Sequence, residues 1–211
     1  MTLTERERQF IQALASKIRV LTFEQISGMW WPDSDSGRTN ARRRLAELAE
    51  HELLTRTRVH ARPLIKLTSP LCRWKPGEPA PDFQSLAWQL HERWREPLQT
   101  MTAYLATKRA AGIFGGVCEG RIKNPSQASH DIHLSGVYLH FLRTAPALAA
   151  GWVGEDVLAP SRVDQKLPDA ILHDGEGRPR LAIEFGGSYQ AVRIADFHAD
   201  CAARTLPYEL W

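Results

Sequence analysis

The chain has 211 residues, enough for one large domain or two small ones, and its 43% apolar content supports a hydrophobic core. Its three cysteines are widely spaced and odd in number, which argues against a disulfide framework and fits a reducing compartment. The first ten residues lack the apolar core of a signal peptide, and no apolar stretch is long enough to span a bilayer. We therefore expect a cytoplasmic protein without membrane contact.

Charge is distributed unevenly along the chain, although the net charge is only +3. Residues 1–75 contain 14 Lys and Arg against 8 Asp and Glu, whereas residues 76–211 contain 13 against 16. A basic segment ahead of a slightly acidic remainder suits contact with phosphate groups. A solvated charged face without a partner is the alternative, and charge alone does not decide between the two.

The first third of the chain carries three helix signals followed by two strand signals. Two capping-box patterns, in which paired side chains satisfy free backbone amides, start the first two helices: Thr4 with Glu7, and Thr22 with Gln25. Ser36 is the expected cap of a third helix over residues 37–52. Residues 53–59 and 64–67 then predict two strands joined by a turn. Three helices followed by a β-hairpin is the order of a winged helix.

Arginines gather on the third predicted helix and on the predicted hairpin. In a helix-turn-helix the second helix enters the major groove, where Arg can clamp guanine and Asn can pair with adenine. Arginines on the hairpin suit phosphate groups or the minor groove. We therefore expect the following residues to contact double-stranded DNA: Arg38, Thr39, Asn40, Arg42, Arg43, Arg56, Arg58 and Arg62. A three-helix adaptor that binds protein is the alternative.

The chain beyond a proline-rich segment at residues 74–82 predicts further elements. Residues 83–110 carry apolar side chains at spacings of three and four, typical of a long helix that serves as a linker or as a dimer contact. The remaining elements follow as helix, three strands, helix and strand: residues 130–144, 151–157, 169–173, 181–185, 191–203 and 208–211. This alternation is typical of an α/β layer arrangement.

The order of several short motifs resembles that of the replication-relaxation family of plasmid and mobile-element proteins. The first match is RVLTFEQISGMWW followed by ARRRLAELAEHELLTRTRV, and the second is the pair His130-Asp131 at the start of a helix. An extended Pro168-Asp169-Ala170 and a strand that ends in Glu184 come next. The family combines a winged helix with a C-terminal α/β domain. The resemblance implies a role in plasmid replication, DNA relaxation or DNA transfer.

The C-terminal motifs are also similar to those of restriction-endonuclease-like nucleases, in which Pro-Asp is followed by Glu, any residue and Lys. Carried over, Asp169 and Glu184 become ligands of Mg²⁺, which prefers oxygen ligands and can activate water for phosphodiester cleavage. The sequence departs from the pattern because Gly186 stands at the lysine position, so no adjacent cation orients the water. Groups elsewhere are candidates to complete a catalytic site: Lys166, Arg193, His130 and Asp131.

Together these observations predict an α+β fold with a winged helix-turn-helix at residues 1–75, a linker helix region at 76–111 and an α/β restriction-endonuclease-like domain at 112–211. We expect a DNA-binding protein of a plasmid or mobile element, acting as a regulator or as an accessory factor in replication or relaxation. We expect neither catalysis nor a cofactor, and a homodimer contact through the long helix. A Mg²⁺-dependent DNA nuclease that uses Asp169 and Glu184 is the main alternative, and a protein-binding adaptor is the other.

Overall fold

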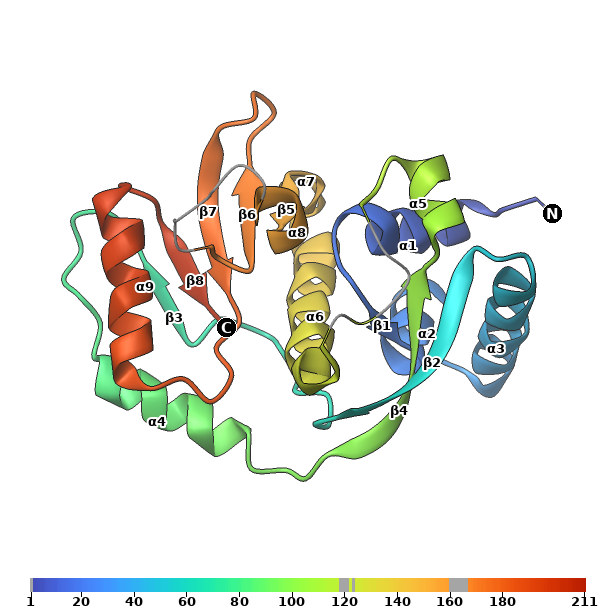
Figure 1. Ribbon diagram of the computed structural model, residues 1–211, viewed down its shortest axis with the longest axis horizontal. Coiled ribbons are helices and arrows are strands. Elements are labelled where there is room, and N and C mark those ends of the chain that lie inside the picture. Colours follow the sequence, from blue (N-terminus) through green and yellow to red (C-terminus); the bar gives the residue numbers. More distant parts are fainter. Residues whose placement is uncertain (1, 118–121, 123, 160–166) are drawn as a thin grey trace. The chain divides into compact units, whose positions relative to one another are not determined.

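The computed structural model describes residues 2–117, 122, 124–159 and 167–211, which form a mixed α+β fold with two β-sheets (Figure 1). The helices are α1 (Glu5–Ser16), α2 (Phe23–Trp30), α3 (Asp35–Glu50), α4 (Phe83–Arg93), α5 (Lys108–Phe114), η1 (Pro125–Gln127), α6 (Ala128–Thr144), α7 (Pro146–Ala150), α8 (Glu155–Leu158) and α9 (Ala191–Ala203). The strands are β1 (Leu21–Thr22), β2 (Leu54–Ala61), β3 (Cys72–Trp74), β4 (Gln99–Ala106), β5 (Trp152–Gly154), β6 (Ala170–His173), β7 (Pro179–Glu184) and β8 (Tyr208–Leu210). None of these helices combines the length and the apolar character that crossing a bilayer requires.

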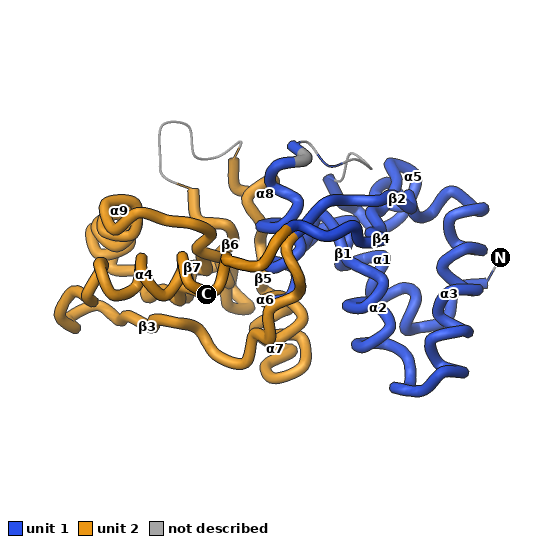
Figure 2. The backbone as a smooth tube through the Cα atoms, turned by 90° about the horizontal axis from the view of Figure 1, so that it is seen from below, with its two compact units in different colours: residues 1–61, 98–136 blue, residues 62–97, 137–211 orange. Residues whose placement is uncertain are grey.

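The chain forms two compact units, each assembled from two separate stretches of sequence (Figure 2). Unit 1 comprises residues 1–61 and 98–136, and unit 2 comprises residues 62–97 and 137–211. The chain therefore leaves unit 1 after β2, returns to it with β4, and leaves it again within α6. These units differ from the three consecutive segments of the prediction because residues 62–97 contribute β3 and α4 to unit 2.

The first three helices of unit 1 begin with capping interactions. The predicted capping boxes are present: the Thr4 amide donates to the Glu7 carboxylate at 2.8 Å, and the Thr22 amide donates to the Gln25 side chain at 2.9 Å. The third helix begins two residues earlier than the prediction placed it. Its cap is Ser34, whose hydroxyl accepts the backbone N–H of Gly37 at 3.1 Å.

The sheet of unit 1 has the strand order β1-β4-β2, and both pairings are antiparallel. Strand β4 pairs with the whole of β2, from Leu54 opposite Ala106 to Ala61 opposite Gln99. The predicted partner of β2 was wrong, because residues 64–67 form no strand. The returning strand instead comes from β4, which is separated from β2 by the 37 residues 62–98.

The second half of the predicted long helix at residues 83–110 was also wrong. Helix α4 ends at Arg93, and Pro97 lies between it and β4. Proline lacks the backbone N–H that a helix interior requires, while Thr and Tyr residues such as Thr100, Thr102 and Tyr104 favour a strand. The apolar residues of this segment also fit helical spacing. In the structure, however, β4 pairs with β2, and Ala103 and Leu105 of β4 pack with Val59 of β2 against α6.

Unit 2 contains a five-stranded sheet in the order β3-β8-β7-β6-β5. Strands β5, β6 and β7 form an antiparallel meander, β8 runs parallel to β7, and β3 pairs with β8 at the edge. On one face, Phe197 and Cys201 of α9 pack against Tyr208 and its neighbours. On the other face, rings of α6 contact Trp152 and Trp211. The predicted elements over residues 169–211 are therefore present as two strands, a helix and a strand.

Candidate functional site

Helix α3 has a buried face and an exposed face. Its buried face consists of Gly37, Ala41, Leu45 and Leu48, which recur at helical spacing. The predicted DNA-contacting residues lie elsewhere around the helix: Thr39, Asn40, Arg42 and Arg43 are exposed, and Arg38 is partly buried. Most of the α3 residues that were predicted to contact DNA therefore lie at the surface of unit 1.

Two of the α3 arginines have carboxylate partners at the surface. Arg38 pairs with Glu24 at 2.8 Å, and its guanidinium lies over the Phe23 ring at 5.2 Å. Arg43 pairs with Glu47 at 2.6 Å, and 63% of its side chain is exposed. Exposed ion pairs of this kind contribute only about 0–1 kcal/mol to stability. Neither pair therefore prevents the guanidinium from moving to a phosphate.

Three further arginines are exposed and have no carboxylate partner among the residues that the structure describes: Arg42, Arg56 and Arg58. Arg42 lies over the Phe23 ring at 4.7 Å. Burial raises the pKa of the Tyr104 hydroxyl, and the positive charges of Arg56 and Arg42 oppose that rise, so both arginines lie near the same hydroxyl. Arginines of α3 and of β2 therefore occupy one side of unit 1.

The strand β2 divides its side chains between the core and solvent. Arg56 and Arg58 are exposed on one face, whereas Val59 and Ala61 are buried. Arg56 stands opposite Tyr104 in the ladder, and Arg58 stands opposite Thr102. Because alternate residues of a strand point to opposite faces, both arginines share the face that carries Tyr104.

Arg62 does not join this group. It belongs to unit 2, where its guanidinium donates to the backbone carbonyl of Glu96 and lies over the Trp94 ring at 5.4 Å. The predicted turn at residues 60–63 does not form a hairpin, because the chain continues into unit 2 at this point. Arg62 was predicted to lie on the hairpin, and that placement is wrong.

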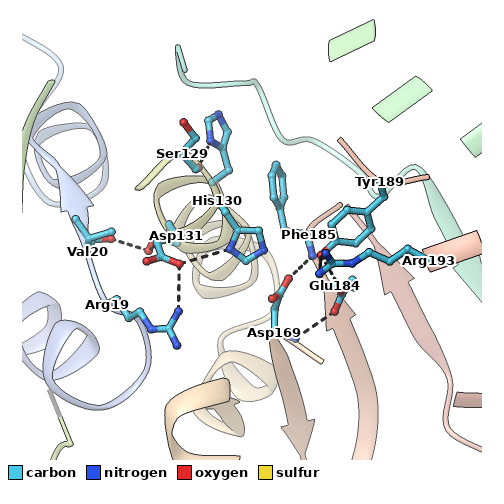
Figure 3. A network of polar contacts seen from close by, with 12 residues as sticks. Arg19, Val20, Ser129, His130, Asp131, Asp169, Glu184, Phe185, Tyr189 and Arg193 are labelled. Carbon is cyan, nitrogen blue, oxygen red and sulfur yellow. Dashed lines mark hydrogen bonds and ion pairs between the residues drawn. The ribbon is translucent and has the colours of Figure 1, made fainter. Parts of the chain in front are cut away.

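The two predicted metal ligands come together in unit 2 (Figure 3). Asp169 and Glu184 lie one step beyond the paired residues Ala170 and Ile183 of β6 and β7. The Asp169 amide donates to Glu184 Oε2 at 3.3 Å, and the Phe185 amide donates to Asp169 Oδ2 at 2.7 Å. This register confirms the prediction that Asp169 and Glu184 lie at the same end of the β6–β7 strand pair.

Two further residues complete the network: Tyr189, which sequence reasoning did not join to this pair, and Arg193, which it named as a candidate. The Tyr189 hydroxyl donates to Glu184 Oε1 at 2.8 Å, and Arg193 donates to the Tyr189 oxygen at 2.8 Å (Figure 3). Burial and the negative charges of Glu184 and Asp169 raise the pKa of Tyr189 far above its ordinary value of 10. The hydroxyl therefore keeps its proton, and its role here is that of a hydrogen-bond donor.

The structure gives a packing reason for the glycine at the lysine position of the nuclease pattern. A Cβ atom on Gly186 would lie 2.7 Å from a methyl group of Leu90, whose side chain is fully buried. Arg93 of α4 donates to the Gly186 carbonyl at 2.7 Å, and its guanidinium lies over the Phe185 ring. Burial lowers the pKa of Arg93 to about 10.

Two of the other catalytic candidates, His130 and Asp131, belong to unit 1. Asp131 is buried in unit 1, where it pairs with Arg19 at 3.2 Å and its carboxylate lies 3.5 Å from His130 Nδ1 (Figure 3). Lys166 lies outside the described residues. Within the described part of the chain, no three side chains of His, Cys, Asp or Glu gather as a metal site.

No protein-family model, curated protein or solved structure matches the chain. The resemblance to the replication-relaxation family therefore stays a prediction from short motifs. We therefore infer a function from the exposed arginines of unit 1 and the carboxylate pair of unit 2.

Proposed function

We propose that unit 1 is a winged helix that binds double-stranded DNA, with α3 in the major groove and the β2–β4 pair beside it. Helices α2 and α3 are joined by the four residues 31–34, the spacing of a helix-turn-helix. An antiparallel pair of strands follows, and β1 completes the sheet. Three helices closed by such a pair is the order expected of a winged helix.

The observation that carries this proposal is the group of three exposed arginines Arg42, Arg56 and Arg58, which lack a carboxylate partner in the described residues. A cation without a protein partner binds phosphate at little cost, because no ion pair must first be broken. Thr39 and Asn40 lie on the same helix as Arg42 and supply hydrogen-bonding groups for base edges. We infer a regulator or an accessory factor of a plasmid or mobile element, without catalytic activity.

The test is fluorescence anisotropy of a labelled duplex, measured over a series of salt concentrations. Each neutralised phosphate contributes about 0.9 to the slope of log affinity against log salt, so three arginines predict a slope of about −2.7 or steeper. Arg42→Gln, Arg56→Gln and Arg58→Gln should each reduce the slope by about 0.9. The control is Arg8→Gln, which removes an exposed arginine of α1 that also lacks a carboxylate partner among the described residues. A slope near zero, or equal losses in the control, would favour the adaptor instead.

A Mg²⁺-dependent nuclease is the second candidate, and the meeting of Asp169 and Glu184 favours it. Apart from the short helices α7 and α8, the elements α6, β5, β6, β7, α9 and β8 follow the expected order of helix, three strands, helix and strand. Two carboxylates with bound waters can hold Mg²⁺. However, three of their four oxygens already accept hydrogen bonds from Phe185, Tyr189 and the Asp169 amide. Among the described residues no group of three His, Cys, Asp or Glu side chains gathers as a metal site, so we derive no cleavage step from the pair.

This second candidate has a direct test. Supercoiled plasmid incubated with the protein and Mg²⁺ or Mn²⁺ should stay intact if the protein is not catalytic. The matched variant is Asp169→Asn, which keeps the size of the side chain and removes its charge. Nicking by the natural chain that disappears in Asp169→Asn would overturn the non-catalytic proposal.

A further inference from the structure

A cavity of about 390 Å³ lies within unit 1, between the start of α1, the turn after α2 and the first half of α3. Its volume falls within the range of about 300–1,000 Å³ that is typical of small-molecule sites. Three arginines contribute to its wall, Arg6, Arg43 and Arg44, and Glu7 is the acidic residue among its lining. The cavity is therefore lined mainly by cations and by neutral polar groups such as Asn40.

The three arginines of this cavity differ in their carboxylate partners. Glu7 is 1% exposed and is already occupied by Arg44, whose Nε lies 2.6 Å from Glu7 Oε1. Glu47 lies outside the lining and is shared by Arg43 and Arg44. Arg6 has no carboxylate partner among the described residues, and it contacts only the Trp30 carbonyl, at 3.3 Å, and the Trp31 ring, at 5.4 Å. Two of the three guanidinium groups of the lining therefore have carboxylate partners, and that of Arg6 has none among the described residues.

The turn after α2 packs closely against α3 where both line the cavity. A Cβ atom on Gly37 would lie 2.1 Å from the Pro32 carbonyl oxygen, so the turn approaches α3 as closely as a glycine permits. Trp31, which is 9% exposed, supplies a flat apolar surface beside the arginines. The shape of the cavity therefore does not depend on a mobile side chain at the turn.

We propose that this cavity binds a phosphate group. Guanidinium groups bind phosphate oxygens through paired, charge-assisted hydrogen bonds, which suits Arg6 and Arg43 at the rim. Asn40 of α3 supplies a neutral hydrogen-bond donor. The phosphate has two chemical sources, a free phosphomonoester or the backbone of bound DNA, and only the second source rests on the proposed DNA binding.

The test uses the full chain and titration calorimetry with adenosine monophosphate, with inorganic phosphate and with adenosine, which lacks the phosphate. For a free phosphomonoester, we expect saturable binding of one adenosine monophosphate, no saturable heat with adenosine, and roughly tenfold weaker binding in Arg6→Gln. Arg8→Gln, two residues further along α1 and outside the cavity, is the matched control and should bind as the natural chain does. Binding lost equally in both variants would show unspecific attraction to a basic surface and would overturn the proposal.

The second arm repeats the duplex anisotropy with the same two variants. If the small phosphates do not bind but Arg6→Gln weakens DNA binding severalfold and Arg8→Gln does not, the phosphate comes from the DNA backbone. If neither small phosphates nor DNA responds to Arg6→Gln, the cavity does not bind phosphate. If Arg6→Gln has no effect but Arg42→Gln and Arg56→Gln still weaken DNA binding, the cavity proposal fails and the proposed function stands. The two failures are therefore distinguishable.

Discussion

The buried ion pair between Glu7 and Arg44 is predicted to be a main link between α1 and α3. The Glu7 carboxylate accepts hydrogen bonds from Arg44 Nε at 2.6 Å, from Arg44 Nη2 at 3.0 Å and from the Thr4 amide at 2.8 Å. Glu7→Gln keeps the size of the side chain but removes its negative charge. It also replaces one carboxylate oxygen by an NH₂ group, which cannot accept a hydrogen bond from the Arg44 guanidinium. Breaking one partner of a buried ion pair costs about 3–5 kcal/mol. Because Arg44 is 21% exposed and keeps Glu47, we expect the lower end, about 3 kcal/mol.

The same pair gives a prediction for pH. Burial raises the pKa of Glu7, but the hydrogen bonds from Arg44 and Thr4 outweigh it, so the pKa lies below its ordinary value of 4.5. A carboxylate whose pKa is lowered by folding contributes stability that is present above the ordinary pKa and lost as pH falls through the folded value. The difference in stability between the natural chain and Glu7→Gln should therefore be constant near neutral pH and shrink below pH 4.5.

Urea unfolding at neutral and acidic pH measures this difference, and hydrogen exchange of α1 and α3 peptides shows whether the loss falls in unit 1. The control is Arg43→Gln, which breaks an exposed pair and should cost less than about 1 kcal/mol. A double-mutant cycle with Arg44→Met should give a coupling of about 1–3 kcal/mol. If Glu7→Gln costs no more than the control, or its cost does not change with pH, the reasoning is refuted.

Three further variants test packing and hydrogen bonding. Gly37→Ala places a Cβ atom 2.1 Å from a backbone oxygen and should cost about 1–3 kcal/mol in urea unfolding, whereas Gly28→Ala, with nothing within 4 Å, should be neutral or stabilising; equal effects would contradict the close approach. Tyr189→Phe removes the donor to the buried carboxylate of unit 2 and should lower stability by about 1–3 kcal/mol, and an unchanged unfolding midpoint would argue against that hydrogen bond. Gly186→Ala should destabilise unit 2 through contact with Leu90, and combining it with Leu90→Ala should be non-additive, because the shorter side chain relieves the contact; additive losses would count against it.

Local signals in the sequence predicted those parts of the fold that depend on neighbouring residues. The capping boxes at Thr4 and Thr22 and the helix over residues 191–203 were confirmed, because each depends on side chains within a few positions. The strand β4 was not predictable in this way. Its apolar residues fit a helix as well as a strand, and only pairing with β2, about 40 residues away along the chain, decides between the two.

The candidate sites also contain features that the sequence predicted and contacts that only folding creates. The sequence identified the arginines of α3 and β2 and the carboxylates Asp169 and Glu184 by residue type and order. It did not show which arginines carry ion pairs, because Glu24 and Arg38 meet only through folding. It also did not join Tyr189 to Glu184, although a tyrosine five residues beyond a predicted catalytic glutamate is a signal that can be searched for.

The interleaving of the two units has a consequence for any attempt to shorten the protein. Strand β4 is the middle strand of its sheet, with β1 on one side and β2 on the other. A fragment that ends at residue 75 would keep the three helices and both outer strands but lose the strand that holds the outer ones together. Excising unit 1 therefore requires a splice that joins residue 61 to residue 98 across a short artificial turn. A simple truncation should yield an aggregating chain with two exposed strand edges.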